Sequence, residues 1–152
     1  MNQDTVQLPI KKADHAADIK LPCYMTGGAA GMDLYAAVEE LTTILPGETS
    51  LIPTGLYVAV PDGYELQIRP RSGLAVKKGI GILNSPGTID SDYRGEIKVI
   101  MINLGQKPFT VKRHDRIAQM VLCPVSRAVP FETEQLPSTE RSEGGFGHTG
   151  DK

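Results

Sequence analysis

Short apolar segments recur at close intervals along the chain, and several of them alternate apolar and polar residues. In residues 65–69 every second side chain is apolar, which is the period of a strand with one buried face. The segments with strand character are residues 51–54, 56–60, 65–69, 80–83, 96–103, 109–112 and 117–122. Glycine, proline and aspartate stand at the breaks between them, as in Pro61-Asp62-Gly63. This pattern predicts an all-β domain, either a sandwich, a barrel or a jelly roll.

One short helix and a tail complete the predicted elements. The helix is expected over residues 73–78, with Ser72 as its N-cap. The segment 137–152 is rich in glycine, and Phe146 is its one large apolar residue, so it cannot build a core of its own. We therefore expect a single β domain over residues 1–136, followed by a flexible C-terminal tail over residues 137–152.

Composition and charge restrict the classes of partner. The 152 residues carry 16 Lys and Arg against 18 Asp and Glu, a formal net charge of −2. A balance this close to neutral gives no support for a general nucleic-acid or anionic-membrane binder, so we expect neither partner. Any recognition of phosphate must come from a local group of residues.

The cysteines and the N-terminus bear on the compartment. Cys23 and Cys123 form no C-x-x-C pair, and we expect them to be reduced thiols in the core. Residues 1–20 contain no apolar run, and no stretch approaches the length of a membrane span. These observations favour a cytoplasmic protein.

Polar residues gather in clusters at residues 29–37, 69–75, 83–98 and 141–150. Asp33 stands among small and apolar residues, and Arg71 with Ser72 lies at the start of the predicted helix. The third cluster resembles a hairpin whose turn carries Asp, Tyr and Arg, and Asn84 beside it can both donate and accept, as reading a base edge requires. The aromatic ring of Phe146 in the last cluster could stack on a flat ligand.

Each cluster also has an ordinary structural interpretation. Singly, they fit an aspartate at a strand end, a solvated turn with a helix cap, a hairpin turn and a disordered tail. Together they supply phosphate donors, a reader of a base, an aromatic lid and carboxylates that could activate water. The combination indicates a nucleotide ligand, most simply a triphosphate.

The clusters resemble, in order, the motifs of the trimeric dUTP diphosphatase (dUTPase) family. The resembling segments are residues 30–34 (AGMDL), 70–75 (PRSGLA), 87–96 (GTIDSDYRGE), 113–119 (RHDRIAQ) and 141–150 (RSEGGFGHTG). The third segment is the most specific of them, and the resemblance spans about residues 22–150.

This resemblance implies a β-clip or jelly-roll homotrimer with active sites at its subunit contacts. It implies hydrolysis of dUTP to dUMP and pyrophosphate, by attack of water on the α-phosphorus with Mg²⁺ on the triphosphate. Such a reaction removes dUTP and supplies dUMP for the synthesis of dTTP.

The resemblance also assigns roles to residues of this chain. Asp90 would be the general base, and Asp33 would hold metal-bound water. The phosphates would be bound by Arg71, Ser72, Gly73, Gln119, Arg141 and Thr149. Uracil and deoxyribose would be bound by Asn84, Thr88, Ile89, Tyr93, Lys98 and Phe146.

Departures from the family pattern occur at Ser142 and His114, where the family has glycine. We expect Ser142 to restrict the tail slightly and His114 to lie in a surface turn without a catalytic role. The alternatives are a related dCTP deaminase and a nucleotide-gated binding or regulatory protein of the same fold. The intact third and fifth motifs argue against the deaminase, and the retained Asp90 argues against a protein that only binds.

Overall fold

The computed structural model describes residues 5–145, and its elements are mainly short strands. The strands are β1 (Ile10–Lys12), β2 (Met32–Tyr35), β3 (Thr42–Ile44), β4 (Thr49–Val58), β5 (Tyr64–Arg69), β6 (Ile80–Ile82), β7 (Gly87–Ile89), β8 (Glu96–Asn103), β9 (Phe109–Val111) and β10 (Arg116–Pro124). The helical elements are the 3₁₀ turn η1 (Asp14–Ala16) and the α-helix α1 (Ser72–Lys78). The all-β prediction with one short helix is confirmed.

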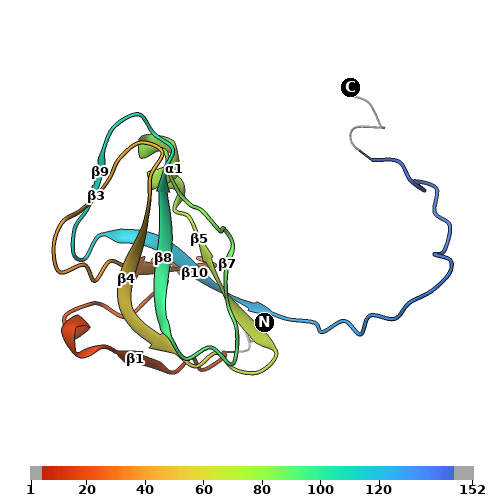
Figure 1. Ribbon diagram of the computed structural model, residues 1–152. Coiled ribbons are helices and arrows are strands. Elements are labelled where there is room, and N and C mark those ends of the chain that lie inside the picture. The colour runs from red at the N-terminus through yellow and green to blue at the C-terminus, as the bar shows by residue number, and fades with distance from the viewer. Residues whose placement is uncertain (1–4, 146–152) are drawn as a thin grey trace.

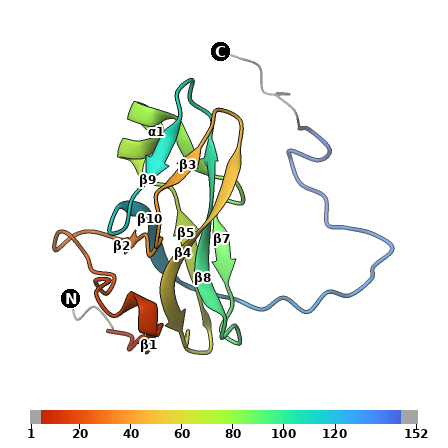
Figure 2. The same cartoon turned by 60° about the vertical axis from the view of Figure 1, so that its left-hand side comes forward.

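The strands form two 4-stranded sheets and one 2-stranded sheet, and all pairings are antiparallel. The first sheet has the order β1-β4-β8-β6, the second has the order β2-β10-β5-β7, and β3 pairs with β9. The long strands β4 and β8 run side by side (Figure 1). Helix α1 lies toward the same end of the molecule as β3 and β9 (Figure 2).

The core takes alternate side chains from the strands of both large sheets. In β8 the inward positions are Ile97, Val99 and Met101, all with at most 1% exposure, while the residues between them are less buried. This is the period of two that the sequence shows, and burial of these side chains drives the two sheets together.

The sequence pattern located the longer elements and misjudged some boundaries. Residues 51–54 and 56–60 lie mostly within one strand, β4, whose pairing is irregular between Pro53 and Tyr57. Gly55 at this irregularity has a φ of 65°, a conformation that glycine adopts at little cost. The helix begins at Ser72 and its N-cap is Arg71, so the expectation of Ser72 as N-cap is wrong by one residue.

Asn103 ends β8 and is fully buried, with 0% exposure. Its side-chain amide donates to the carbonyls of Ile44 and Lys107, both at 2.8 Å, and its Oδ1 accepts from the N–H of Gly105 at 2.9 Å. One side chain therefore joins the end of β3, the β8–β9 loop and the strand itself. It satisfies backbone groups that would otherwise lose water without gaining a partner.

Both cysteines are free thiols, as expected, but the core position is wrong for Cys23, which is exposed. Cys123 is partly buried on β10. No helix within residues 5–145 is long and apolar enough to cross a membrane. From Val125 to Gly145 the chain leaves the sheets and runs away from the body (Figures 1 and 2). The division between residues 136 and 137 and the flexibility of the tail stay predictions.

Candidate active site

A hollow of about 270 Å³ lies where β2, β10 and the start of α1 meet. Strands β2 and β10 are paired with Asp33 opposite Gln119, and α1 follows directly on β5, the other neighbour of β10. The lining residues are Met25, Ala29, Gly31, Asp33, Arg71, Ser72, Gly73, Arg116 and Gln119. The structure therefore brings together residues from the first, second and fourth motif segments.

Asp33 lies between two guanidinium groups in this hollow and is only 8% exposed. Its Oδ1 is 3.2 Å from Nε of Arg71, and its Oδ2 accepts from Nη1 of Arg116 at 3.1 Å. Arg71 also donates to the carbonyl of Arg116 at 3.0 Å. The charged lining is thus two arginines and one carboxylate, a net positive charge that suits an anion with several oxygens.

Gln119 is fixed in the same hollow by close packing. Its Nε2 donates to the carbonyl of Pro70 at 3.0 Å. A side chain at Gly31 would place its Cβ 2.5 Å from Oε1 of Gln119, so a larger residue there would displace this amide. The amide of Gln119 is therefore held beside the segment that carries Arg71 and Ser72.

A second hollow, of about 520 Å³, lies between β4, β7 and β8. Its lining residues are Leu51, Tyr57, Thr88, Ile89, Asp90, Tyr93, Glu96, Lys98 and Ile100. Most of the residues expected to contact uracil and deoxyribose lie here, together with the expected general base. Asn84 stands just outside it, where its Nδ2 would lie 3.2 Å from a Cβ at Gly87.

The segment 83–98 does not form the regular hairpin that its sequence suggests. Strand β7 pairs with β5 in one sheet, whereas β8 pairs with β4 and β6 in the other. The segment therefore passes from sheet to sheet, and Asp90 stands at the crossing. The backbone at Gly87 runs close to its neighbours, because a Cβ there would lie 3.2 Å from Nδ2 of Asn84 and 3.4 Å from the Cβ of Ile68 on β5.

Asp90 and Tyr93 occupy one tight turn at the rim of the second hollow. The N–H of Tyr93 donates to the carbonyl of Asp90 at 3.2 Å, and the Asp90 side chain is exposed. The Tyr93 ring packs over Gly95, and its hydroxyl donates to the carbonyl of Glu96 at 3.1 Å. Glu96 in turn accepts from the N–H of Gly55 at 2.9 Å and lies 3.5 Å from Nζ of Lys98. The tyrosine is therefore held in place, although it is 42% exposed.

The two hollows share none of their lining residues. Within this chain, the arginines of the first hollow and Asp90 of the second are not brought into one cavity. Arg141 does not join them either, because it is exposed and donates locally to the carbonyl of Gly144 at 2.8 Å. Phe146 and Thr149 lie outside the described residues.

Arg116 is the charged lining residue that the sequence analysis did not select. It stands in the fourth motif segment as the first residue of β10, but the motif alone does not show which way the side chain points. The pairing of β10 with β2 places it against Asp33. The signal available in the sequence was that Arg116 is a cation three residues before Gln119, which was expected to bind phosphate.

The carboxylates of the described residues do not form a metal cage. No group of three or more His, Cys, Asp or Glu within residues 5–145 converges on a common point. Magnesium takes only one or two protein carboxylates when substrate phosphates and water supply its other ligands. Asp33, the carboxylate that lines the first hollow, fits this requirement.

Known proteins resemble this chain over almost its whole length. The family model described as dUTPase matches residues 17–150. A deoxyuridine 5'-triphosphate nucleotidohydrolase from Caldanaerobacter subterraneus subsp. tengcongensis is 59% identical over 146 residues, covering 96% of this chain and 99% of that protein. One from Wolbachia sp. subsp. Brugia malayi is 53% identical over 152 residues, covering 99% of this chain and 97% of that protein. The structure of Staphylococcus bacteriophage 80alpha dUTPase with dUPNHPP matches with a TM-score of 0.85 at 25% identity, covering 96% of this chain and 99% of that chain.

The all-β fold and these matches define the class of protein, a nucleotidohydrolase of the dUTPase-like fold. The chain belongs to the dUTPase family and is an enzyme that hydrolyses dUTP. The family resemblance read from the sequence motifs is confirmed.

Proposed function

We propose that the protein converts dUTP to dUMP and pyrophosphate by attack of water on the α-phosphorus, with Asp90 as general base. The observation that carries this proposal is the hollow in which Arg71 and Arg116 flank Asp33 beside Ser72 and Gln119. Guanidinium forks bind phosphate oxygens in two directions at once, and they offset negative charge that develops during phosphoryl transfer. The reaction removes dUTP and provides dUMP for the synthesis of dTTP.

Asp90 meets the requirements for activating water. Its carboxylate is exposed at the rim of the second hollow, and the Tyr93 N–H fixes its backbone. A general base must reach the proton of the attacking water, and its carboxylate must not be engaged in an ion pair with a neighbouring cation. Within the described residues Asp90 enters no ion pair, whereas Asp33 is held between two arginines. These positions favour Asp90 as the base. Asp33 is instead favoured as the residue that orders the two arginines beside it.

The second hollow suits a base and a sugar. Thr88 and Ile89 of β7 line this hollow, and Asn84 lies beside the start of that strand. The backbone of β7 and the Asn84 amide together can satisfy the edge of uracil and leave no room for the methyl group of thymine. Tyr93, fixed over Gly95, would pack under deoxyribose, where a ribose hydroxyl would clash. Lys98 completes the wall, and Phe146 of the tail would stack on the base.

A homotrimer would unite the two hollows. Because they share no lining residue in one chain, a complete site can combine the arginine hollow of one copy with the Asp90 hollow of another. Large apolar side chains lie exposed on the surface, including Leu51, Leu83 and Leu104. Such side chains are expected where copies of the chain meet. Arg141 and Thr149 of the tail would then close on the phosphates.

Magnesium belongs to this proposal as a partner of the triphosphate. When bound, it spreads the charge on the phosphate oxygens. Asp33 is the residue that would hold its water, although each of its oxygens already forms an ion pair with an arginine. The chain's own contribution is to orient the phosphates through Arg71, Ser72 and Gln119 and to place Asp90 near the attacking water.

The proposed reaction is tested by measuring pyrophosphate release with Mg²⁺ from dUTP, dTTP, dCTP and UTP side by side. We expect rapid release from dUTP alone. Release from several nucleotides would keep the phosphate chemistry and contradict the roles given to β7 and Tyr93. Ammonia from dCTP would identify the deaminase alternative. Nucleotide binding without turnover would favour the binding or regulatory protein, which a pull-down with and without dUTP would then examine.

Arg71 provides a second test of the phosphate hollow. Replacing Arg71 with glutamine removes one of the two cations and leaves Asp33 with a single partner. Hydrogen bonds to charged groups contribute about 1.5–3 kcal/mol, so the KM for dUTP should rise roughly 10- to 150-fold. Lys20→Gln removes the same charge from an exposed residue outside both hollows and should leave KM unchanged. Equal kinetics in the two variants would place the triphosphate elsewhere.

A further inference from the structure

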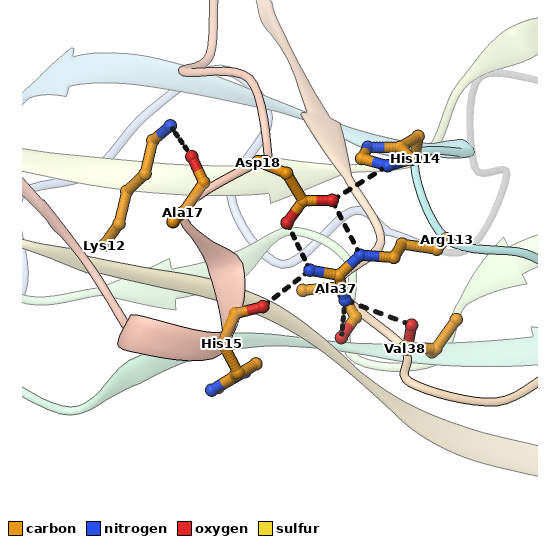
Figure 3. A network of polar contacts seen from close by, with 8 residues as sticks. All are labelled: Lys12, His15, Ala17, Asp18, Ala37, Val38, Arg113 and His114. Atoms are coloured by element: carbon orange, nitrogen blue, oxygen red, sulfur yellow. Dashed lines mark hydrogen bonds and ion pairs between the residues drawn. The ribbon is translucent and has the colours of Figure 1, made fainter.

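A cluster of polar contacts lies outside both hollows, where the segment around η1 meets the turn between β9 and β10 (Figure 3). Asp18 accepts from Arg113 through both oxygens: Nε donates to Oδ2 at 3.0 Å, and Nη2 lies 2.5 Å from Oδ1. Nε2 of His114 is 3.1 Å from Oδ2 of the same carboxylate. We call these three residues, Asp18, Arg113 and His114, the clasp.

The guanidinium of Arg113 joins segments that are far apart in the sequence. Besides Asp18, it donates through Nη2 to the carbonyl of His15 at 2.6 Å. It also donates through Nη1 to the carbonyls of Ala37 at 3.2 Å and Val38 at 3.3 Å (Figure 3). One side chain thus fixes the η1 segment, the residues that follow β2 and its own turn relative to one another.

The clasp is continuous with the arginine hollow. The N–H of His114 donates to the carbonyl of Ala36, and the N–H of Ala36 donates to the carbonyl of Asp115, both at 2.9 Å. Arg116 is the next residue along the chain, and its partner across the ladder is Tyr35. Strands β2 and β10, which line the arginine hollow, are therefore joined directly to the turn that holds Arg113 and His114. A displacement of the turn would move Arg116 away from Asp33.

His114 makes this turn dependent on outside support. Its φ is 70°, a left-handed conformation that costs a residue with a Cβ free energy relative to glycine. Such residues persist where the surroundings hold them in place. Within residues 5–145, the ion pair of the His114 ring is with the carboxylate of Asp18. The carboxylate therefore supports the turn through two of its residues at once.

We propose that Asp18 is a positioning residue for the triphosphate: through Arg113 and His114 it fixes the turn that places Arg116 in the arginine hollow. The proposal rests on the proposed function, because it takes the hollow to be the phosphate site. Hydrogen bonding by Arg113 lowers the pKa of Asp18 from 3.8 to about 2. The Asp18–Arg113 ion pair is therefore fully formed above about pH 4 and is lost only as the pH falls toward 2.

The test compares Asp18→Asn with Asp14→Asn. Asp14 lies exposed in η1 and enters none of the ion pairs within the described residues, so the second variant controls for the same chemical change nearby. We expect Asp18→Asn to raise the KM for dUTP roughly 2- to 30-fold, the range of indirect coupling between neighbouring sites. Inhibition by pyrophosphate, which has only phosphates, should weaken by the same factor. Inhibition by deoxyuridine, which has none, should stay as in the parent.

The paired inhibitors separate positioning from a general loss of structure. A lower melting temperature with unchanged pyrophosphate inhibition would show a purely structural role and overturn the proposal. Loss of deoxyuridine inhibition as well would overturn it too. Arg113→Lys keeps the charge but not the fork, and it should reproduce the phosphate defect even if Asp18→Asn fails to fold. His114→Gly relieves the left-handed strain at this turn. The rise in KM caused by Asp18→Asn should therefore be smaller in the His114→Gly background than in the parent.

The same assays distinguish this proposal from the proposed function. Absence of dUTP hydrolysis in the parent protein would contradict the function itself. Normal hydrolysis in the parent, with Asp18→Asn and Asp14→Asn alike in KM and in pyrophosphate inhibition, would contradict only the role of Asp18.

Discussion

Replacing Asp90 with asparagine should lower kcat for dUTP by roughly 10²- to 10⁴-fold, the usual contribution of general acid–base catalysis. Asparagine has the shape of aspartate but cannot take a proton from water. The exposed side chain and its turn, closed by the Tyr93 N–H, should survive the change. Binding of dUTP should therefore stay near the parental value, which calorimetry measures beside single-turnover pyrophosphate release.

Asp92→Asn is the matched control for this prediction. Asp92 is exposed in the same turn, two residues further along, and it is absent from the lining of the second hollow. We expect nearly parental turnover in this variant. Full activity of Asp90→Asn, or an equal loss in both variants, would remove Asp90 from the role of base.

Asn103→Ala should lower the free energy of unfolding by about 3 kcal/mol or more, because several backbone groups lose their hydrogen bonds and each such loss costs about 1–3 kcal/mol. The substitution deprives the carbonyls of Ile44 and Lys107 and the N–H of Gly105 of their partner. Denaturant unfolding at one fixed protein concentration measures the loss, since assembly also contributes to stability.

Gln106→Ala controls for this change in the same loop. Its side chain is exposed and makes none of the side-chain hydrogen bonds around Asn103, so the free energy of unfolding should change by no more than about 0.5 kcal/mol. A loss below about 1 kcal/mol in Asn103→Ala would mean that water replaces the amide at little cost.

The longer strands were predictable because each shows the period of two over enough residues. The whole of β8, Glu96–Asn103, was located to the residue. Strands β1, β3 and β7 were missed because each has a single large apolar residue and so shows no period, whereas the equally short β6 and β9 each have two. Strand β2 was missed because three of its four residues are buried, so inward and outward positions do not alternate. The crossing of β7 into the second sheet depends on long-range pairing with β5, which no local pattern encodes.

The candidate site was predictable where one motif carries its residues together. Arg71, Ser72 and Gly73 are neighbours in sequence and in the hollow. Arg116 was not found, because its orientation follows from the pairing of β10 with β2. The clasp was equally hidden: Asp18 and Arg113 lie 95 residues apart, and an aspartate near a short helix has no distinctive sequence pattern. His114 was noted as a departure, and the structure shows that its ring contacts Asp18.

The separation of the arginine hollow from the Asp90 hollow also affects how mutations in different copies of the chain combine. Under the proposed assembly, a working site draws its phosphate donors from one gene product and its base from another molecule of that product. A defective copy would therefore damage sites that it shares with intact neighbours. Conversely, two copies with defects in different hollows could combine into one intact site. The fitness of a sequence variant in this family would then depend on which other variants are made in the same cell.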